Sequence, residues 1–398
     1  MRKVALRGLR ARPLRTILTA MSVVLGVAMI AGTYVLTDTI NRSFSEVFAQ
    51  ANSGTDVVVV PRSVDEDFYS EAAPLDDRLV ERVRAVEGVA VAAGGIQGEV
   101  SLRDAAGERI GGATTFVVSL QPGPLDAFAF VSGRAPRAAD EVALSAKAFR
   151  DEGLELGDTI KIVGHEGAQP FRLVGSATFG DVGTVAGFPA AVVTLPTAQA
   201  LAGRRGEVDT ISVAGRDGMA PARLRASIAG ALQGERVEVR TGAQDAAQQT
   251  ADLEESFGFI RTALLVFGGI ALFVGAFVIY NTFTITVAQR TRELALLRTL
   301  GASRRQVLRS VVLEAGLIGL LASLLGLLGG LLLAPGLRGL LKVIGADLPA
   351  TASVFATRTI VVALAVGVLV TVLASLVPAL RATRIAPIIA LREGLTAE

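Results

Sequence analysis

The sequence QRTRELALLRTLGASRRQVLRSVVLE, residues 289–314, lies between two long apolar runs and carries six arginines. Three of its leucines recur on one face of a predicted helix: Leu294, Leu297 and Leu300. Gly301 then predicts a helix stop, and Ser303 followed by Gln306 predicts a capping box at the start of a second helix. A helix, a glycine break and a second helix are more order than a simple connection requires, which indicates a segment that docks on something.

Apolar runs flank this stretch and recur elsewhere in the chain. Four runs lack charged residues for long enough to cross a bilayer, which takes about 20 apolar residues: Thr16–Thr37, Thr262–Gln289, Ala315–Leu337 and Thr359–Leu380. At 51% hydrophobic and 19% charged residues, the chain is too apolar for a soluble protein and too charged to lie wholly in a membrane. We expect an integral membrane α-helical protein with four transmembrane helices and one large soluble domain.

The arginines and lysines predict the orientation of these spans, because cytoplasmic loops are enriched in positive residues. They cluster in residues 1–15, in residues 290–314 and in the tail, so we expect these segments and both termini in the cytoplasm. Residues 38–257 then lie outside, where 20 basic and 32 acidic side chains give a net charge of −12. The first apolar run is too long for a signal peptide, and its positive flank covers 15 residues, so we expect an uncleaved anchor.

The predicted organisation follows from these boundaries. Residues 1–15 are either an amphipathic helix in the inner headgroup layer or only a positive flank of the first span. The remaining segments are a first transmembrane helix (16–37), an extracytoplasmic domain with a helical stalk (38–257), a second helix (258–289), a cytoplasmic loop (290–314), a third helix (315–337), a short outer loop (338–358), a fourth helix (359–380) and a cytoplasmic tail (381–398).

The extracytoplasmic region alternates predicted strands and helices, which indicates an α+β domain of roughly 200 residues. Strands are predicted at 56–61, 88–102, 114–120, 159–163, 171–178, 191–194 and 210–214, and helices at 75–86, 145–152, 196–201 and 220–232. Residues 136–145, PRAADEVALS, are predicted to form a turn. The polar segment Gln244–Glu255 is predicted to run alongside a helical extension of the first span at Ile40–Ala51.

Small residues at four-residue intervals mark candidate contacts between the spans, because they let helix backbones approach closely. Gly26 and Gly32 in the first span each follow another small residue by four positions. Gly326 and Gly330 in the third span form a GxxxG pair. We predict that these four glycines serve helix packing.

Four stretches, in this order, resemble the MacB/FtsX-like permeases of ATP-binding-cassette (ABC) transporters, the mechanotransmitting class that includes lipoprotein-extracting and macrolide-exporting systems. They are PLRTILTAMSVVLGVAM (13–29), GRAPRAADEVALSAKAFRDEGLELGDTIKI (133–162), RELALLRTLGASRRQVLRSVVLEA (292–315) and RIAPIIALREG (384–394). The second resembles the MacB-like core of the family's extracytoplasmic domain and the third its coupling loop. The resemblance covers nearly all of the chain.

The resemblance implies a permease of a bacterial cell membrane that exports or extracts a lipid, lipoprotein, peptide or drug. A separate cytoplasmic ATPase dimer would bind ATP and Mg, a second permease copy or paralogue would complete the complex, and an extracytoplasmic substrate or adaptor would be a further partner. By the same resemblance, the ATPase-coupling residues are Arg292, Glu293, Leu294, Leu297, Arg298, Gly301, Ala302 and Ser303.

Other chemistry has little support in the sequence. There is no cysteine, the single histidine His165 cannot make a metal site alone, and none of the four lysines is followed by Ser or Thr, so a GKS/GKT phosphate loop is absent. We expect no catalytic residue, metal, cofactor or nucleic-acid partner in this chain.

Two alternatives stay open. The chain could be a signalling scaffold that senses a ligand or activates a cell-wall hydrolase under control of the ATPase, although the size of the outer domain favours transport. Topology alone could also explain the arginines, and Glu293 could merely balance them. Topology does not explain the LGAS break, so Gly301, Ala302 and Ser303 carry the more specific signal.

Overall fold

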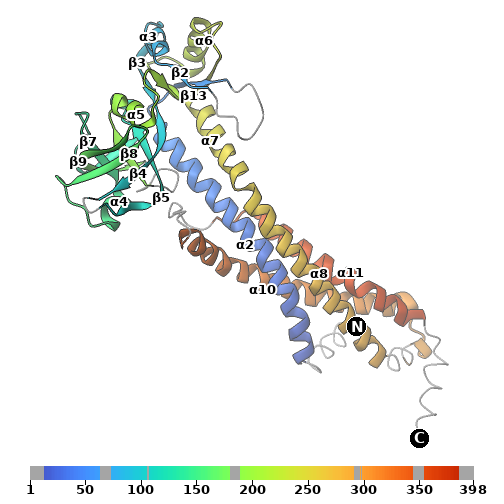
Figure 1. The fold of residues 1–398 in the computed structure, drawn as a ribbon. Coiled ribbons are helices and arrows are strands. Elements are labelled where there is room, and N and C mark those ends of the chain that lie inside the picture. Colours follow the sequence, from blue (N-terminus) through green and yellow to red (C-terminus); the bar gives the residue numbers. More distant parts are fainter. Residues whose placement is uncertain are drawn as a thin grey trace. The chain divides into compact units, whose positions relative to one another are not determined.

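The computed structural model describes residues 13–62, 73–104, 107–179, 189–290, 296, 298–343 and 354–384. The chain divides into two compact units (Figure 1). We call Met1–Thr39, Ser256–Leu340 and Ala352–Glu398 the helical unit, and Ile40–Glu255 with Leu341–Thr351 the soluble unit. Several predictions lie outside the described residues: residues 1–12 of the N-terminal helix, residues 344–353 of the outer loop, residues 385–398 of the tail, and Arg292, Glu293, Leu294 and Leu297.

Four helices in the described part of the chain are long and apolar enough to cross a membrane: α2 (Pro13–Ala51), α8 (Gly258–Gln289), α10 (Arg304–Val343) and α11 (Thr357–Arg384). A helix satisfies its backbone hydrogen bonds internally, which is what an apolar segment needs in lipid. The domain of mixed helices and strands is inserted between α2 and α8. The predicted fold class is therefore confirmed.

Glycines bring α2 and α10 into backbone contact. A Cβ at Gly330 would lie 2.7 Å from the Cβ of Ala31 and 2.8 Å from the backbone nitrogen of Gly32, and one at Gly326 would lie 2.7 Å from the Cβ of Val27. Gly26 faces α8 instead, where its Cβ would lie 2.7 Å from the Leu272 side chain. Only glycine permits these approaches, so the α2–α10 contact depends on it.

A polar cluster joins α2 to α11 within the helical unit. The buried carboxylate of Asp38 accepts hydrogen bonds from Arg358 and from the Thr359 hydroxyl. The Arg358 guanidinium also lies 5.7 Å from the centre of the Tyr34 ring, a cation–π distance. A buried charge of this kind is stable only while it is paired, so the cluster fixes the start of α11 to the part of α2 around Asp38.

The first part of the soluble unit is an antiparallel sheet of four strands in the order β13 (Val237–Thr241), β1 (Val57–Pro61), β12 (Thr210–Gly215) and β3 (Val89–Gly95). Helices α3 (Arg78–Arg84) and α6 (Pro221–Ala231) cover it, and their apolar faces enter its core through Val83, Leu224 and Ile228. A short strand pair, β2 (Leu75–Asp76) with β11 (Glu207–Val208), forms a separate two-stranded sheet, and its Leu75 and Val208 belong to the same core.

The second part is a ring of strands. Its order is β6 (Phe128–Gly133), β9 (Gly167–Phe179), β7 (Glu141–Ser145), β10 (Ala190–Val193), β5 (Arg109–Ser119), β4 (Gln97–Arg103) and β8 (Thr159–Gly164). Because β8 pairs with both β4 and β9, six of these strands close on themselves and β6 adds to β9. A separate apolar core fills the ring, and α5 (Leu195–Ala202) contributes Ala198 and Leu201 to it.

Three predictions in this unit are wrong. Residues 141–145 form the buried strand β7 rather than part of a turn; β7 pairs with both β9 and β10. A strand covered on both faces lacks the alternation that identifies a half-exposed strand. The helix predicted at 75–86 begins only at Arg78, because Leu75 and Asp76 belong to β2. The single strand predicted at 88–102 is two strands, β3 and β4, which belong to different sheets. Strands β2, β6, β11 and β13 were not predicted.

Glu141 begins β7 as a buried carboxylate with two arginine partners. Arg134 donates to both carboxylate oxygens at 2.6 and 2.7 Å, and Arg172 donates at 2.7 Å. The backbone N–H of Arg137 adds a bond of 3.0 Å. These bonds, that from Arg134 first, hold the pKa of Glu141 far below its ordinary value.

Acid is expected to weaken the ring of strands through this residue. Because the pKa of Glu141 is depressed in the fold, its stabilisation is complete above the unfolded pKa, near 4.5, and is lost as pH falls toward the folded pKa. Glu141→Gln should therefore lower the melting temperature of the detergent-solubilised chain at pH 7, and the gap to wild type should shrink between pH 5 and pH 3. Glu87→Gln, at an exposed carboxylate, is the control. A gap that stays constant down to pH 3 would contradict this assignment.

Candidate functional site

The connection from α8 to α10 is the candidate site, and an ion pair defines its base. Arg290 follows the last residue of α8, and its Nη1 lies 3.1 Å from Oε2 of Glu314 on α10. The Glu314 side chain is largely buried, at 12% exposed. The two helices are therefore tied where the connection leaves and returns. Glu314 balances the charge of Arg290.

The glycine break lies at the far end of the connection. The N–H of Leu300 donates to the carbonyl of Leu296 at 3.1 Å, and the N–H of Gly301 donates to that of Arg298 at 3.1 Å. Gly301 itself has φ +99°, in the region that residues with a Cβ rarely adopt. The predicted stop at Gly301 is confirmed.

The capping box is also present at the start of α10. The N–H of Ser303 donates to Oε1 of Gln306 at 2.8 Å, and the N–H of Gln306 donates to Oγ of Ser303 at 3.3 Å. These reciprocal bonds satisfy two backbone donors that a helix start leaves open. The turn between the two helices therefore has a fixed backbone.

The side chains on this turn are unusual for a mere connection. Leu300 is 85% exposed and Leu296 is 50% exposed. Arg304 and Arg305 are exposed in the first turn of α10, which holds no acidic residue. Positive charge at a helix N-terminus opposes the helix dipole, at a cost of about 0.3–1 kcal/mol each. An exposed leucine among cations in such a place fits a surface that binds a partner with apolar and acidic groups.

The structure places only part of the predicted coupling set. Gly301, Ala302 and Ser303 form the turn, and Arg298 precedes it on the same short helical segment. Arg292, Glu293, Leu294 and Leu297 lie outside the described residues. The exposure of Leu296 and Leu300 was not predicted from the sequence. A leucine beside a glycine break and several arginines could have indicated an exposed apolar side chain. The coupling role itself stays a prediction.

Removing the cap should loosen the start of α10 without unfolding the chain. Ser303→Ala removes the acceptor of the Gln306 N–H and is expected to cost about 1 kcal/mol of local stability. Hydrogen exchange at residues 304–307 of the full chain should become about fivefold faster, because each 1.4 kcal/mol corresponds to a factor of ten. Ser303→Asn keeps a capping oxygen and should exchange like wild type. Equal acceleration in both variants would show that the cap is not the cause.

Metal chemistry has no counterpart in the described part of the chain. No group of three or more His, Asp or Glu side chains there could hold a metal ion.

Comparison with known families agrees with this architecture. The model of the MacB-like periplasmic core domain matches residues 16–231, and that of the FtsX-like permease C-terminal region matches residues 265–387. The four apolar helices and the inserted domain define a multi-pass membrane protein. The first match alone covers more than half of the chain, so the chain belongs to the MacB/FtsX-like permease family.

Individual relatives share limited sequence identity with the chain and match only part of it. The chain is 31% identical to an uncharacterized ABC transporter permease protein of Mycobacterium tuberculosis over 64% of its own length and 29% of the relative's. It is 28% identical to the macrolide export ATP-binding/permease protein MacB of Agrobacterium fabrum over 47% of its length and 28% of the relative's. The periplasmic region of MacB from Actinobacillus actinomycetemcomitans aligns over 50% of this chain and 95% of that one, with 14% identity and a TM-score of 0.38. The chain spans less than half the length of the curated relatives that it matches first.

Proposed function

We propose that this chain is the permease subunit of an ABC transporter and that the turn between α8 and α10 binds a separate cytoplasmic ATPase. One observation carries the proposal: Leu300 is 85% exposed on a turn whose backbone is fixed by Gly301 and by the Ser303–Gln306 capping box. Membership of the permease family and the arginines around this turn support it. The ATPase would supply the sites for ATP and Mg.

The same proposal assigns sides of the membrane. The arginine-rich connection faces the cytoplasm together with both termini, because positive loops are retained there. The soluble unit then faces the outside. A second copy of the chain or a paralogue would complete the complex, and the substrate would be a lipid, lipoprotein, peptide or drug that is exported or extracted.

Movement at the connection would be passed on by rigid parts. The Arg290–Glu314 pair ties α8 to α10, so a force on the turn acts on both helices. Helix α2 continues without a break from Pro13 to Ala51 and leads into β1. In the soluble unit, α7 (Gly242–Ser256) leads on from β13 and lies beside the end of α2, where Asn41 donates a hydrogen bond to Glu254. Packed helices with a fixed connection to a sheet can transmit rigid-body motion.

A close joint connects these two helices to the sheet. The N–H of Gly242 donates to the carbonyl of Asp56 at 2.9 Å, and a carboxylate oxygen of Asp56 accepts from the N–H of Gly215 at 2.7 Å. A Cβ at Gly242 would lie 2.0 Å from the carbonyl oxygen of Thr55, which is closer than any real contact. The joint therefore requires glycine at position 242, and it packs α2, β1 and α7 closely against one another.

Gly242→Ala is expected to uncouple movement of the soluble unit from binding of the ATPase. The added methyl group forces Gly242 away from Thr55, so ATPase binding should persist while ATP-dependent movement of the soluble unit is lost. The chain has no cysteine, so one cysteine introduced at the exposed Arg223 can carry a spin label in each copy, and the label–label distance can be followed with and without ATP. Gly230→Ala is the matched control, since nothing lies within 4 Å of its Cβ. An unchanged ATP response in the Gly242 variant would remove the joint from the proposed pathway.

The proposed function is tested by purifying the tagged chain from its native host in mild detergent and identifying what co-purifies. We expect a small ABC ATPase in stoichiometric amount. Recovery of a cell-wall hydrolase or a sensor kinase, and no ATPase in several detergents, would overturn the transporter assignment in favour of a signalling scaffold.

A further inference from the structure

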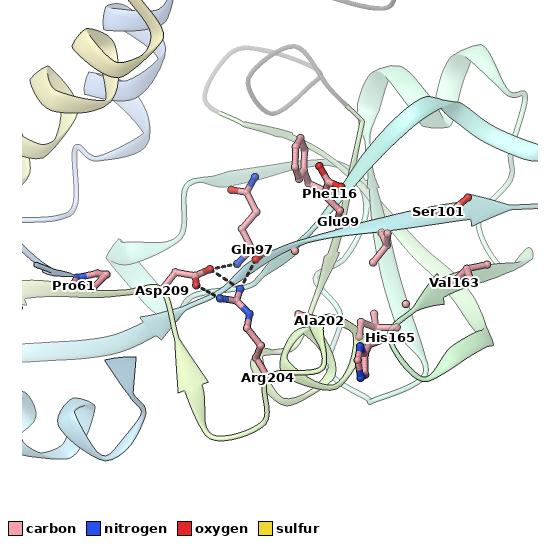
Figure 2. A pocket seen from close by; sticks show the side chains of 14 residues that line it. Pro61, Gln97, Glu99, Ser101, Phe116, Val163, His165, Ala202, Arg204 and Asp209 are labelled. Carbon is pink, nitrogen blue, oxygen red and sulfur yellow. Dashed lines mark hydrogen bonds and ion pairs between the residues drawn. The ribbon is translucent and has the colours of Figure 1, made fainter. Parts of the chain in front are cut away.

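A cleft of about 1000 Å³ runs along one strand of the soluble unit (Figure 2). Five successive residues of β4, from Gln97 to Ser101, line it. Its other walls come from the end of β8, from the end of α5 and from the segment around Arg204 and Asp209. A cleft that follows a strand in this way exposes backbone as well as side chains.

The strand β4 is paired over its whole length on one side only. On that side β5 pairs with β4 from Gln97 onward. On the other side β8 pairs with β4 only from Ser101 to Arg103. Among the described residues, no strand therefore pairs with this edge of β4 between Gln97 and Val100.

The chain is drawn away from this edge where β8 ends. The N–H of His165 donates to the carbonyl of Leu201 at 2.8 Å, and a Cβ at Gly164 would lie 2.6 Å from that same carbonyl oxygen. The end of β8 is thus held against α5 instead of continuing along β4. The open edge is a fixed feature of the ring.

Side chains occupy the first position of the open edge. The N–H of Gln97 donates to Oδ2 of Asp209 at 2.8 Å, and Nη2 of Arg204 donates to the carbonyl of Gln97 at 2.7 Å. Arg204 and Asp209 also pair with each other at 2.6 Å, and these bonds are drawn in Figure 2. Together they supply to Gln97 the acceptor and the donor that a neighbouring strand would supply.

The next position of the edge is open. In an antiparallel ladder the N–H and C=O of alternate residues point to the same side. The N–H and C=O of Gln97 point away from β5 and toward the cleft, so those of Glu99, two residues further on, do the same. In agreement, Phe116, which lies opposite Glu99 on β5, donates its own N–H away from β4, to the carbonyl of Pro189. Within the described part of the chain, no strand or side chain is paired with the backbone of Glu99 there. The edge offers one unpaired donor and one unpaired acceptor.

We infer that this cleft receives an extended peptide segment of a partner protein, which adds to β4 by pairing its backbone with Glu99. Such strand addition takes its affinity from main-chain hydrogen bonds and its selectivity from the side chains beside the edge. From Gln97 to Ser101 the strand covers about 13 Å at the usual rise per residue, so the paired segment is about three residues long.

The negative charge around the cleft indicates which side chains the bound segment carries. The Glu99 side chain is exposed at the cleft and the Phe116 side chain is half-buried beside it. Residues 38–257 carry a net charge of −12. Basic side chains alternating with apolar ones therefore match the cleft best. The inference does not depend on the docking of an ATPase, because all of its residues belong to the soluble unit.

The probe is the fluorescent pentapeptide Lys-Val-Lys-Val-Lys, measured by fluorescence anisotropy with the purified full chain in detergent. We expect saturable binding and slower hydrogen exchange at residues 97–101. Two analogues, N-methylated at the third residue or at the second and fourth, remove backbone donors of opposite edges. One of them should bind at least about fivefold more weakly, since a single hydrogen bond contributes about 1 kcal/mol.

Two protein variants test whether the charge of Glu99 contributes to peptide binding. Glu99→Lys should weaken binding of the parent peptide about fivefold or more, whereas Glu155→Lys, the same change at another exposed site, should leave it unchanged. Two results would overturn the inference: no saturable binding to the wild-type chain up to millimolar peptide, or equal affinity for the parent and both methylated analogues. The Arg204–Asp209 pair would then only protect the strand edge from other chains.

Discussion

Replacing Gly330 by leucine is expected to separate α2 from α10 and to destabilise the helical unit by about 3 kcal/mol or more, at the upper end of what overpacking costs. A Cβ at this position already meets the backbone of Gly32 at 2.8 Å and the carbonyl oxygen of Ala28 at 2.9 Å. Backbone atoms cannot rotate away as a side chain can, so one helix has to move. The temperature at which the detergent-solubilised chain aggregates, read by size-exclusion chromatography after heating, should fall sharply.

Gly336→Leu is the matched control for this experiment. Gly336 lies on the same helix, six residues further on, and nothing stands within 4 Å of its Cβ. It introduces the same side chain without the close approach, so its aggregation temperature should stay near that of wild type. Equal losses in the two variants would show that leucine harms α10 for a reason other than contact with α2.

Leu300→Asp is expected to weaken binding of the ATPase by at least about thirtyfold, which corresponds to the 2 kcal/mol that marks an energetically dominant interface residue. The side chain is 85% exposed, so the fold should not depend on it. The substitution places a carboxylate where an apolar anchor is proposed. Titration of the purified ATPase into the purified chain measures the effect directly.

Val131→Asp is the control for the leucine variant, because Val131 is also an exposed apolar residue, at 65%, but belongs to strand β6 of the soluble unit. It should bind the ATPase like wild type. If Leu300→Asp also bound with wild-type affinity, the turn at Gly301 would not be the docking surface, whatever the rest of the chain does.

The parts that the sequence predicted correctly depend on neighbouring residues. Charge-free runs predict spans because a bilayer excludes charge over a known thickness. Gly301, Ser303 and Gln306 predict the turn at the start of α10 because a capping box needs only residues three apart. The confirmed bonds between Ser303 and Gln306 depend on nothing outside that segment.

The parts that were missed depend on residues far apart in the chain. Residues 141–145 were predicted as part of a turn, whereas they form a buried strand that begins with the charged Glu141, which is unfavourable without partners. One of its partners, Arg172, stands 31 residues further along. The closing of the ring through β8 and β9, and the ion pair between Arg290 and Glu314, are likewise set by the tertiary fold.

The candidate site combines both situations. Its backbone turn was predictable, whereas the sequence gives only a signal for an exposed leucine there, and the 85% exposure of Leu300 comes from the structure. The same holds for the cleft beside β4, which exists because α5 holds the end of β8 away from that strand. A local sequence pattern determines neither the pairing of strands nor the exposure of a side chain.

The central claim is that the turn between α8 and α10 contacts the ATPase, and site-specific photo-crosslinking tests it most directly. A benzoylphenylalanine at position 300 of the full chain, irradiated in native membranes, is predicted to crosslink to an ABC ATPase, while the same group at position 131 does not. Recovery of the ATPase with the chain, but without a crosslink from position 300, would contradict the account.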